Sequence, residues 1–308
     1  MELLSYILLF IISLGVLLKA SDWLVGAAER IGLSFGISPF IIGVTIVSFG
    51  TSLPELSSSI VAVLSGSSEI VLGNVVGSNI TNILLVLALT AIVGKQIFLS
   101  YDVMKLDMPL LVGTSFMLMF MLYDKELSKF EACILLGSLV VFLLNSFDSM
   151  EESEDEDRPK VGPRDYVLLG LSAVLVYFGA TYTILSIEEL SSQAGINKEI
   201  IALTAVAIGT SLPEVIVSVT AARKGKTEIA VGNVLGSNIF NTLAVMGIPA
   251  LIGNLKVPES ILDFSLPFMV AMSIMFALVC MSKKITRLEG MMLLLFYAFF
   301  LSFIFKSI

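Results

Sequence analysis

The chain has 308 residues, of which 56% are hydrophobic and only 14% are charged. A soluble domain of this length has no interior large enough to hide that much apolar surface, and the net charge of −8 leaves no basic surface for nucleic acid. The absence of histidine excludes zinc or haem held by histidine and Ser-His catalysis. The charges fall between apolar runs of about 20 residues, the length that spans a bilayer as a helix. We therefore predict an all-α, multi-pass protein of the cell membrane.

Ten apolar segments are predicted to be transmembrane helices. They run roughly over 3–27, 38–64, 69–93, 105–123, 128–147, 165–187, 197–222, 228–252, 260–281 and 287–305. Between the fifth and sixth lies an acidic, proline-containing stretch, 148–163, which carries seven of the acids. We interpret it as a solvated linker between halves 1–147 and 164–308, rather than as a regulatory calcium site.

The distribution of lysine and arginine predicts the orientation of the chain. If the N-terminus lies outside, twelve basic residues fall in inner loops and helix ends and five in outer ones. Basic residues accumulate on the cytoplasmic side of membrane proteins. Both termini are therefore expected outside and the acidic linker in the cytoplasm.

An internal repeat relates the two halves. Residues 50–84 read GTSLPELSSSIVAVLSGSSEIVLGNVVGSNITNIL and residues 209–243 read GTSLPEVIVSVTAARKGKTEIAVGNVLGSNIFNTL, with 20 identities in 35 positions at an offset of 209 − 50 = 159. The register extends backward and pairs Glu29 with Glu188. Because five helices per half is an odd number, the second copy must enter the membrane in the opposite orientation. Such inverted repeats place a binding site near the midplane, on broken helices.

The motif GTSLPE lies midway along an apolar segment in each copy. Pro54 has no N–H and its ring crowds the carbonyl four residues earlier, so the Gly50 carbonyl loses its helical partner. Pro213 is expected to do the same to Gly209. Carbonyls freed in a membrane are tolerated only where they are buried in protein or line a wet cavity. We therefore predict a helix break at each motif.

Oxygen-bearing side chains surround each predicted break at helical spacing. They are Thr51, Ser52 and Glu55 in the first copy and Thr210, Ser211 and Glu214 in the second. Glycine, proline, serine and threonine alone would indicate only a kinked helix. An ionised acid at the bilayer centre, however, costs about 2.5–3.5 kcal/mol on insertion scales, and no basic residue lies within either motif. Carboxylates, hydroxyls and carbonyls are the ligands that Ca²⁺ and Na⁺ prefer.

A second motif follows in each copy, GNVVGSNITN at 73–82 and GNVLGSNIFN at 232–241. Its small residues let helices approach closely, and its polar residues form a stripe with a spacing of four. An ion-facing role is favoured for Ser78, Asn82, Ser237 and Asn241. Contact between helices and ion ligation remain equally open for Asn74, Asn79, Asn233 and Asn238.

The two motifs, in this order and in both halves, resemble the sodium/calcium exchanger family of the cation/calcium antiporter superfamily. The resemblance implies that broken helices 2, 3, 7 and 8 surround a midplane ion site while helices 1 and 6 slide or rock. In the family's pattern the ligands fall on Thr51, Ser52, Glu55, Ser78, Asn82, Thr210, Ser211, Glu214, Ser237 and Asn241. Backbone carbonyls near Ser48 and Ala207 would help to bind sodium.

The function implied is a secondary antiporter, not an enzyme, that exchanges Na⁺ for Ca²⁺ by alternating access, as a monomer and without a cofactor. With two carboxylates in the site, we expect electrogenic calcium extrusion and competition between protons and calcium. Some relatives carry Asp where this chain has Asn82 or Asn241, which argues against potassium co-transport here. A calcium/proton antiporter on the same fold is the main alternative, and a cation channel a weaker one.

Overall fold

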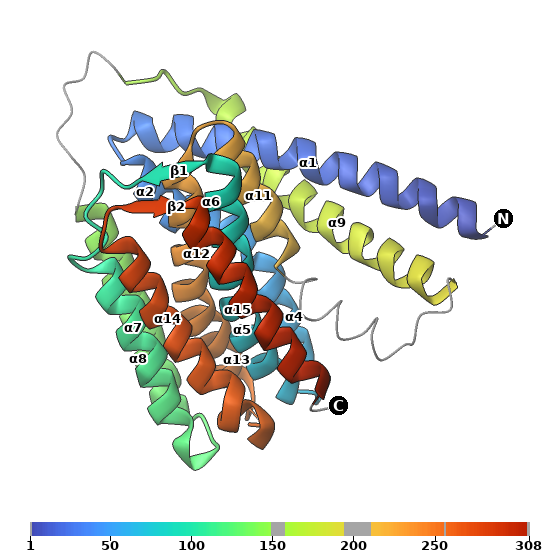
Figure 1. The fold of residues 1–308 in the computed structure, drawn as a ribbon, viewed down its shortest axis with the longest axis vertical. Helices are drawn as coiled ribbons and strands as arrows, with labels where there is room; N and C mark the ends of the chain where they lie inside the picture. The colour runs from blue at the N-terminus through green and yellow to red at the C-terminus, as the bar shows by residue number, and fades with distance from the viewer. Residues whose placement is uncertain (1, 149–157, 194–210, 256, 307–308) are drawn as a thin grey trace.

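Helices make up almost all of the computed structural model, which describes residues 2–148, 158–193, 211–255 and 257–306 (Figure 1). The elements of the first half are α1 (Glu2–Ser34), α2 (Pro39–Ile42), the π-helical turn η1 (Gly43–Val47), α3 (Ser48–Thr51), α4 (Leu53–Leu64), α5 (Glu69–Thr81), the π-helical turn η2 (Asn82–Val86), α6 (Leu87–Gly94), β1 (Gln96–Phe98), α7 (Asp107–Met121), the 3₁₀ turn η3 (Leu122–Asp124) and α8 (Lys129–Asp148). Those of the second half are α9 (Pro163–Gln193), α11 (Leu212–Arg223), α12 (Thr227–Phe240), the π-helical turn η5 (Asn241–Val245), α13 (Met246–Ile252), the π-helical turn η6 (Ile261–Ser265), α14 (Leu266–Cys280), β2 (Lys284–Thr286) and α15 (Arg287–Lys306).

The described residues contain seven helices long and apolar enough to cross a membrane. An eighth is counted if Pro39–Thr51 and Leu53–Leu64, which meet at a bend of 41°, form one span. Two of the ten predicted segments account for the difference. The fourth forms α7, which has only 15 residues, and the seventh lies partly outside the described residues. The chain is thus a mostly helical membrane protein, and the count of ten remains a prediction.

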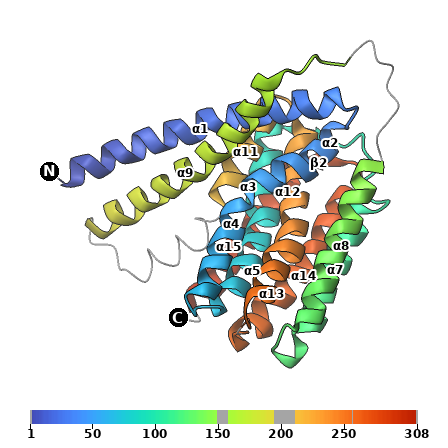
Figure 2. The same ribbon diagram turned by 180° about the vertical axis from the view of Figure 1, so that it is seen from behind.

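Two spans form the centre of the molecule, Glu69–Gly94 and Thr227–Ile252. Within an apolar stretch of 18 residues in each of them, 78% of the residues are buried. The equivalent share is 17–28% in the spans that begin with α1, α8, α9 and α15, which lie around them (Figures 1 and 2). The central spans nevertheless carry the polar second motif, and Asn82 and Asn241 are fully buried in them. Polar groups thus lie at the centre of the bundle, and apolar groups face outward, as the bilayer requires.

The two longest helices, α1 and α9, run side by side and extend away from the remaining helices in both views (Figures 1 and 2). The Thr183 hydroxyl donates to that of Ser13 at 3.0 Å. At the other end of the pair, Arg30 forms an ion pair with Asp165 at 2.8 Å. The structure therefore joins the first and sixth predicted helices into one pair, which a coupled movement requires; the movement itself remains a prediction.

Local structure repeats at the sequence offset of 159. Helix α4 begins and ends at the positions equivalent to those of α11, and the π-helical turns 82–86 and 241–245 correspond as well. Ser52 (φ −89°, ψ 3°) and Ser211 (φ −86°, ψ 5°) have nearly the same backbone conformation. Equivalent sequences thus impose the same local geometry in both halves.

Two details differ from the sequence-based expectation. The second helix breaks as predicted, at Ser52, but the third and eighth run unbroken and widen into π-helical turns that begin at Asn82 and Asn241. Neither turn contains a proline, so the backbone hydrogen bonds shift to the wider π-helical spacing and the helix continues. The structure is also not entirely helical, because β1 and β2 pair antiparallel with Ile97 opposite Ile285.

Candidate cation site

Two fully buried carboxylates, Glu55 and Glu214, lie in the first turns of α4 and α11. Ser52, three residues before Glu55, bonds to Glu214, so the two acids lie at the same helix break. Among the ion pairs of the described residues, none involves either acid. Two acids of the same sign, brought together from the two halves without a basic partner, create a demand for cations.

Hydrogen bonds connect the two copies directly. The Ser52 hydroxyl donates to Oε1 of Glu214 at 3.3 Å. The neighbouring Thr51 hydroxyl donates to Oδ1 of Asn233 at 3.2 Å and lies 3.4 Å from Oγ of Ser237. All five side chains are buried. The helix break in the first half therefore faces both motifs of the second half.

Several buried polar atoms of the two acids and of the motif residues have no hydrogen-bond partner among the described residues. They are both carboxylate oxygens of Glu55, Oε2 of Glu214, the Ser211 hydroxyl, and the side-chain amide groups of Asn82 and Asn241. Buried polar atoms without partners are rare because they are costly. The described part of the chain contains no group of three or more His, Cys, Asp or Glu residues placed to hold a metal. A site of two carboxylates, hydroxyls and amide oxygens suits hard cations rather than transition metals.

The backbone around the first break is already bonded in this conformation. The Ser48 carbonyl accepts from the Ser52 N–H at 2.9 Å, and the Thr51 hydroxyl lies 3.3 Å from it as an alternative donor. The predicted sodium ligation by Ser48 would therefore compete with these bonds, and it remains a prediction. Its counterpart Ala207, with Gly209 and Thr210, lies outside the described residues.

Four asparagines of the second motif donate their side-chain NH₂ groups to acceptors on helices. Asn74 Nδ2 donates to the Glu55 carbonyl at 3.2 Å and Asn233 Nδ2 to the Ser218 hydroxyl at 2.9 Å. Asn79 donates to Thr242 at 2.9 Å, and Asn238 to the Val234 carbonyl at 2.6 Å. The first three contacts join neighbouring helices, whereas the Asn238 bond lies within α12. All four NH₂ groups are thus bonded to protein, which favours the structural alternative for them. Asn74 in addition fixes the turn that carries Glu55.

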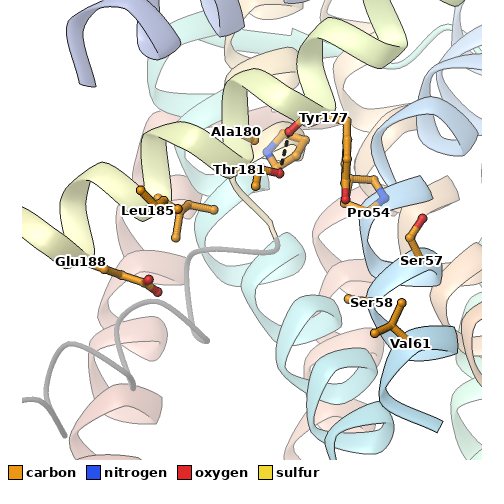
Figure 3. Close-up of a pocket in the computed structure, with 11 residues that line it drawn as sticks. Pro54, Ser57, Ser58, Val61, Tyr177, Ala180, Thr181, Leu185 and Glu188 are labelled. Atoms are coloured by element: carbon orange, nitrogen blue, oxygen red, sulfur yellow. Dashed lines mark hydrogen bonds between the residues drawn. The ribbon is translucent and has the colours of Figure 1, made fainter. Parts of the chain in front are cut away.

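Two features of the structure were not assigned from the sequence. A cavity of about 510 Å³ separates α4 from α9, with Ser57, Ser58 and Val61 on one wall, Tyr177 and Thr181 on the other, Pro54 at one end and Glu188 at the other (Figure 3). Pro213 also lines it. The pairing of Glu188 with Glu29 in the repeat was the available signal. A third buried acid, Asp107, begins α7 beside Tyr101 and lies outside both motifs in sequence.

The family model described as "Sodium/calcium exchanger protein" matches residues 5–147 and 165–306. The sodium/calcium exchanger MaX1 of Methanosarcina acetivorans is 32% identical over 97% of this chain and 98% of its own length. The inner membrane protein YrbG of Escherichia coli is 35% identical over 90% of this chain and 89% of its own.

A solved structure shares the fold. The sodium-calcium exchanger NCX_Mj, soaked with 10 mM Na⁺ and no Ca²⁺, superposes with a TM-score of 0.86 at 29% identity, over 97% of this chain and 99% of that one. The family consists of transporters and not of enzymes. With both sequence motifs, the paired acids and these matches in agreement, the chain belongs to the sodium/calcium exchanger family of cation/calcium antiporters.

Proposed function

We propose that this protein extrudes calcium from the cell in exchange for sodium, and that the exchange is electrogenic. The observation that carries the proposal is the pair of buried acids, Glu55 and Glu214, which meet without a basic partner among the described residues and retain unpartnered oxygens. Two negative charges neutralise one Ca²⁺ or two Na⁺. If more than two sodium ions bind in a cycle, the sodium-loaded site carries excess positive charge, and the membrane potential then drives calcium outward.

The ligands proposed are those of the sequence analysis. Described residues of this set are Thr51, Ser52, Glu55, Ser78, Asn82, Ser211, Glu214, Ser237 and Asn241, and all of them are buried. Thr210 completes the set by repeat equivalence. Backbone carbonyls at Ser48 and Ala207 are proposed to bind sodium when the first-half break rearranges.

The architecture proposed is ten transmembrane helices in two inverted repeats, 1–147 and 164–308, that act as a monomer. The positive-inside distribution supports outer termini and a cytoplasmic linker at 148–163. In this orientation the end of the cavity beside Glu188 lies on the outer side, and we take it as the mouth of the cavity. The cavity reaches Pro54 and Pro213, which flank the acids in sequence, so we propose that it is the outer access path to the site.

Calcium uptake into sealed vesicles tests the proposal. Purified protein is reconstituted into vesicles loaded with sodium, potassium or neither, and radioactive calcium is added outside. Uptake is expected only with internal sodium and should respond to an imposed membrane potential. Uptake driven by a pH gradient without sodium would instead indicate a calcium/proton antiporter, and non-saturating flux without any counter-ion would indicate a channel.

A further inference from the structure

Two turns at equivalent places in the repeat differ only in their flanking residues. The turn between α4 and α5 reads Ser-Gly-Ser at 65–67, and the turn between α11 and α12 reads Lys-Gly-Lys at 224–226. Both turn on a glycine with positive φ, 80° at Gly66 and 75° at Gly225, a conformation that glycine adopts readily. The backbone is thus the same in both turns, and the charge is not.

The two lysines of the second turn bind acids of α1. Lys224 Nζ lies 3.0 Å from Oδ1 of Asp22 and donates to the Asp22 carbonyl, also at 3.0 Å. Lys226 forms an ion pair with Glu29, whose side chain is only 18% exposed. These pairs attach α1 to the turn between α11 and α12, and α1 also packs along α11.

The described residues of the other half have no such ion pairs at the equivalent place. The counterparts of Asp22 and Glu29 are Thr181 and Glu188, which both line the 510 Å³ cavity, and the equivalent turn at 65–67 has no lysine. Here the 510 Å³ cavity reaches Pro54 and Pro213. On the lysine side a smaller cavity of about 350 Å³ is lined by Asp22, Lys224 and other residues of α1 and α11, and on α11 it reaches inward only to Thr220. Thr220 lies about two helical turns short of Pro213.

We propose that the ion pairs Asp22–Lys224 and Glu29–Lys226 form a charge latch, which holds the access path on the lysine side closed. The latch rests on the proposed antiport, because only a transporter that alternates needs to close one path while the other is open. Partly exposed ion pairs are individually weak. This suits a latch that must open in every cycle, since a small bias shifts the populations of two conformations without trapping either.

The accessibility of each path can be measured by labelling a single cysteine placed on it. Ser58 lines the open cavity, and its repeat equivalent, Val217, is fully buried on α11. Ser58→Cys and Val217→Cys are made separately after Cys133 and Cys280, the two native cysteines, have been replaced by serine and alanine. A membrane-impermeant thiol reagent is applied to one face of reconstituted vesicles at a time. The rate of labelling at Val217→Cys from the lysine side reports how often that path opens.

The test variant, Lys224→Ser with Lys226→Ser, gives the second turn the sequence of the first. Labelling at Val217→Cys is expected to rise about two- to tenfold and labelling at Ser58→Cys to fall. Exchanging the charges, with Asp22→Lys and Lys224→Asp together with Glu29→Lys and Lys226→Glu, should restore the parent rates. Arg30→Gln is the matched control. It breaks the ion pair between Arg30 of α1 and Asp165 of α9. That ion pair is not part of the latch, so both labelling rates should stay unchanged.

Unchanged labelling at Val217→Cys in the double serine variant, with the parent protein labelled normally at Ser58→Cys, would overturn the latch. So would a charge exchange that fails to restore the parent rates. Labelling needs no ion transport, so it separates the two hypotheses. A parent protein that labels as expected but shows no sodium-dependent calcium uptake contradicts the proposed function while the latch is still measured.

Discussion

The Ser52 hydroxyl donates a 3.3 Å hydrogen bond to Glu214, a residue 162 positions later in the chain. The bond joins the helix break of the first half to the acid of the second. Both halves therefore contribute side chains to the proposed site. The following predictions depend on this shared site and on the cavity that leads to it.

Replacing either acid by its amide should abolish calcium transport. Glu55→Gln or Glu214→Gln leaves one negative charge for a doubly charged ion, and calcium affinity should fall by about two orders of magnitude or more. Calcium uptake into sodium-loaded vesicles measures the loss. Asp107→Asn is the control, because Asp107 is a buried acid outside both motifs in sequence, and it should retain uptake. Full activity in Glu55→Gln would refute the site.

Protons should compete with calcium. Each proton bound to Glu55 or Glu214 removes a negative charge on which the cation depends, so calcium affinity should fall as the pH is lowered from about 8 to about 6. Calcium binding to the detergent-solubilised protein, measured by isothermal titration, should also release protons. An affinity that stays constant over this range would contradict direct ligation by the two acids.

Adding a third acid should create a need for another cation. Asn82 is fully buried and begins a π-helical turn in a central span. Asn82→Asp gives the calcium-loaded site a net charge of −1, so calcium transport should slow unless potassium or a proton accompanies it. Uptake at varied potassium concentration detects the change. Asn145→Asp, on α8 and outside both motifs, should introduce no potassium dependence.

Removing the charge at the mouth of the cavity should weaken calcium capture without stopping transport. Glu188→Gln is expected to raise the calcium concentration for half-maximal uptake about two- to fivefold, because a negative mouth concentrates cations. The effect should shrink at high ionic strength, where exposed charges are screened. Glu189→Gln changes the next residue of α9, which does not line the cavity. An equal effect of both variants would show that only the overall surface charge matters.

Close packing between the halves should be sensitive to one methyl group. A Cβ added at Gly236 on α12 would lie 2.6 Å from Oγ of Ser48. Gly236→Ala should therefore destabilise the protein by about 1–3 kcal/mol and disturb the adjacent helix break. Thermal unfolding in detergent provides the measurement. Gly137→Ala on α8, where no described atom lies within 4 Å, should leave the unfolding temperature unchanged or raise it.

The acids and the first break could be predicted from the sequence because the signals are local and occur twice. A proline beside a glutamate in the middle of an apolar segment is rarely needed for folding alone. The identical motif 159 residues later makes a purely structural role still less plausible. The positions of Glu55 and Ser52 follow from that pattern alone. The structure agrees on their burial and on the break at Ser52.

The remaining features depend on contacts that a sequence pattern does not encode. Asn74 and Asn82 belong to one polar stripe, yet among the described residues only the Asn74 amide finds hydrogen-bond acceptors on a neighbouring helix. The cavity beside Glu188 depends on how α4 and α9 are placed relative to each other, which neither segment encodes alone. The pairing of β1 with β2 joins segments nearly 190 residues apart, and no local propensity in three-residue strands indicates it.

That short ribbon has a further consequence for how the molecule is held together. Together with the packing of α6 against α15 and of α12 against η1, it ties the halves to each other at places remote from the acidic stretch that connects them in sequence. Covalent continuity between the halves therefore contributes little to their cohesion. The connecting stretch is free to differ in length and charge without disturbing the geometry in which the two acids face each other.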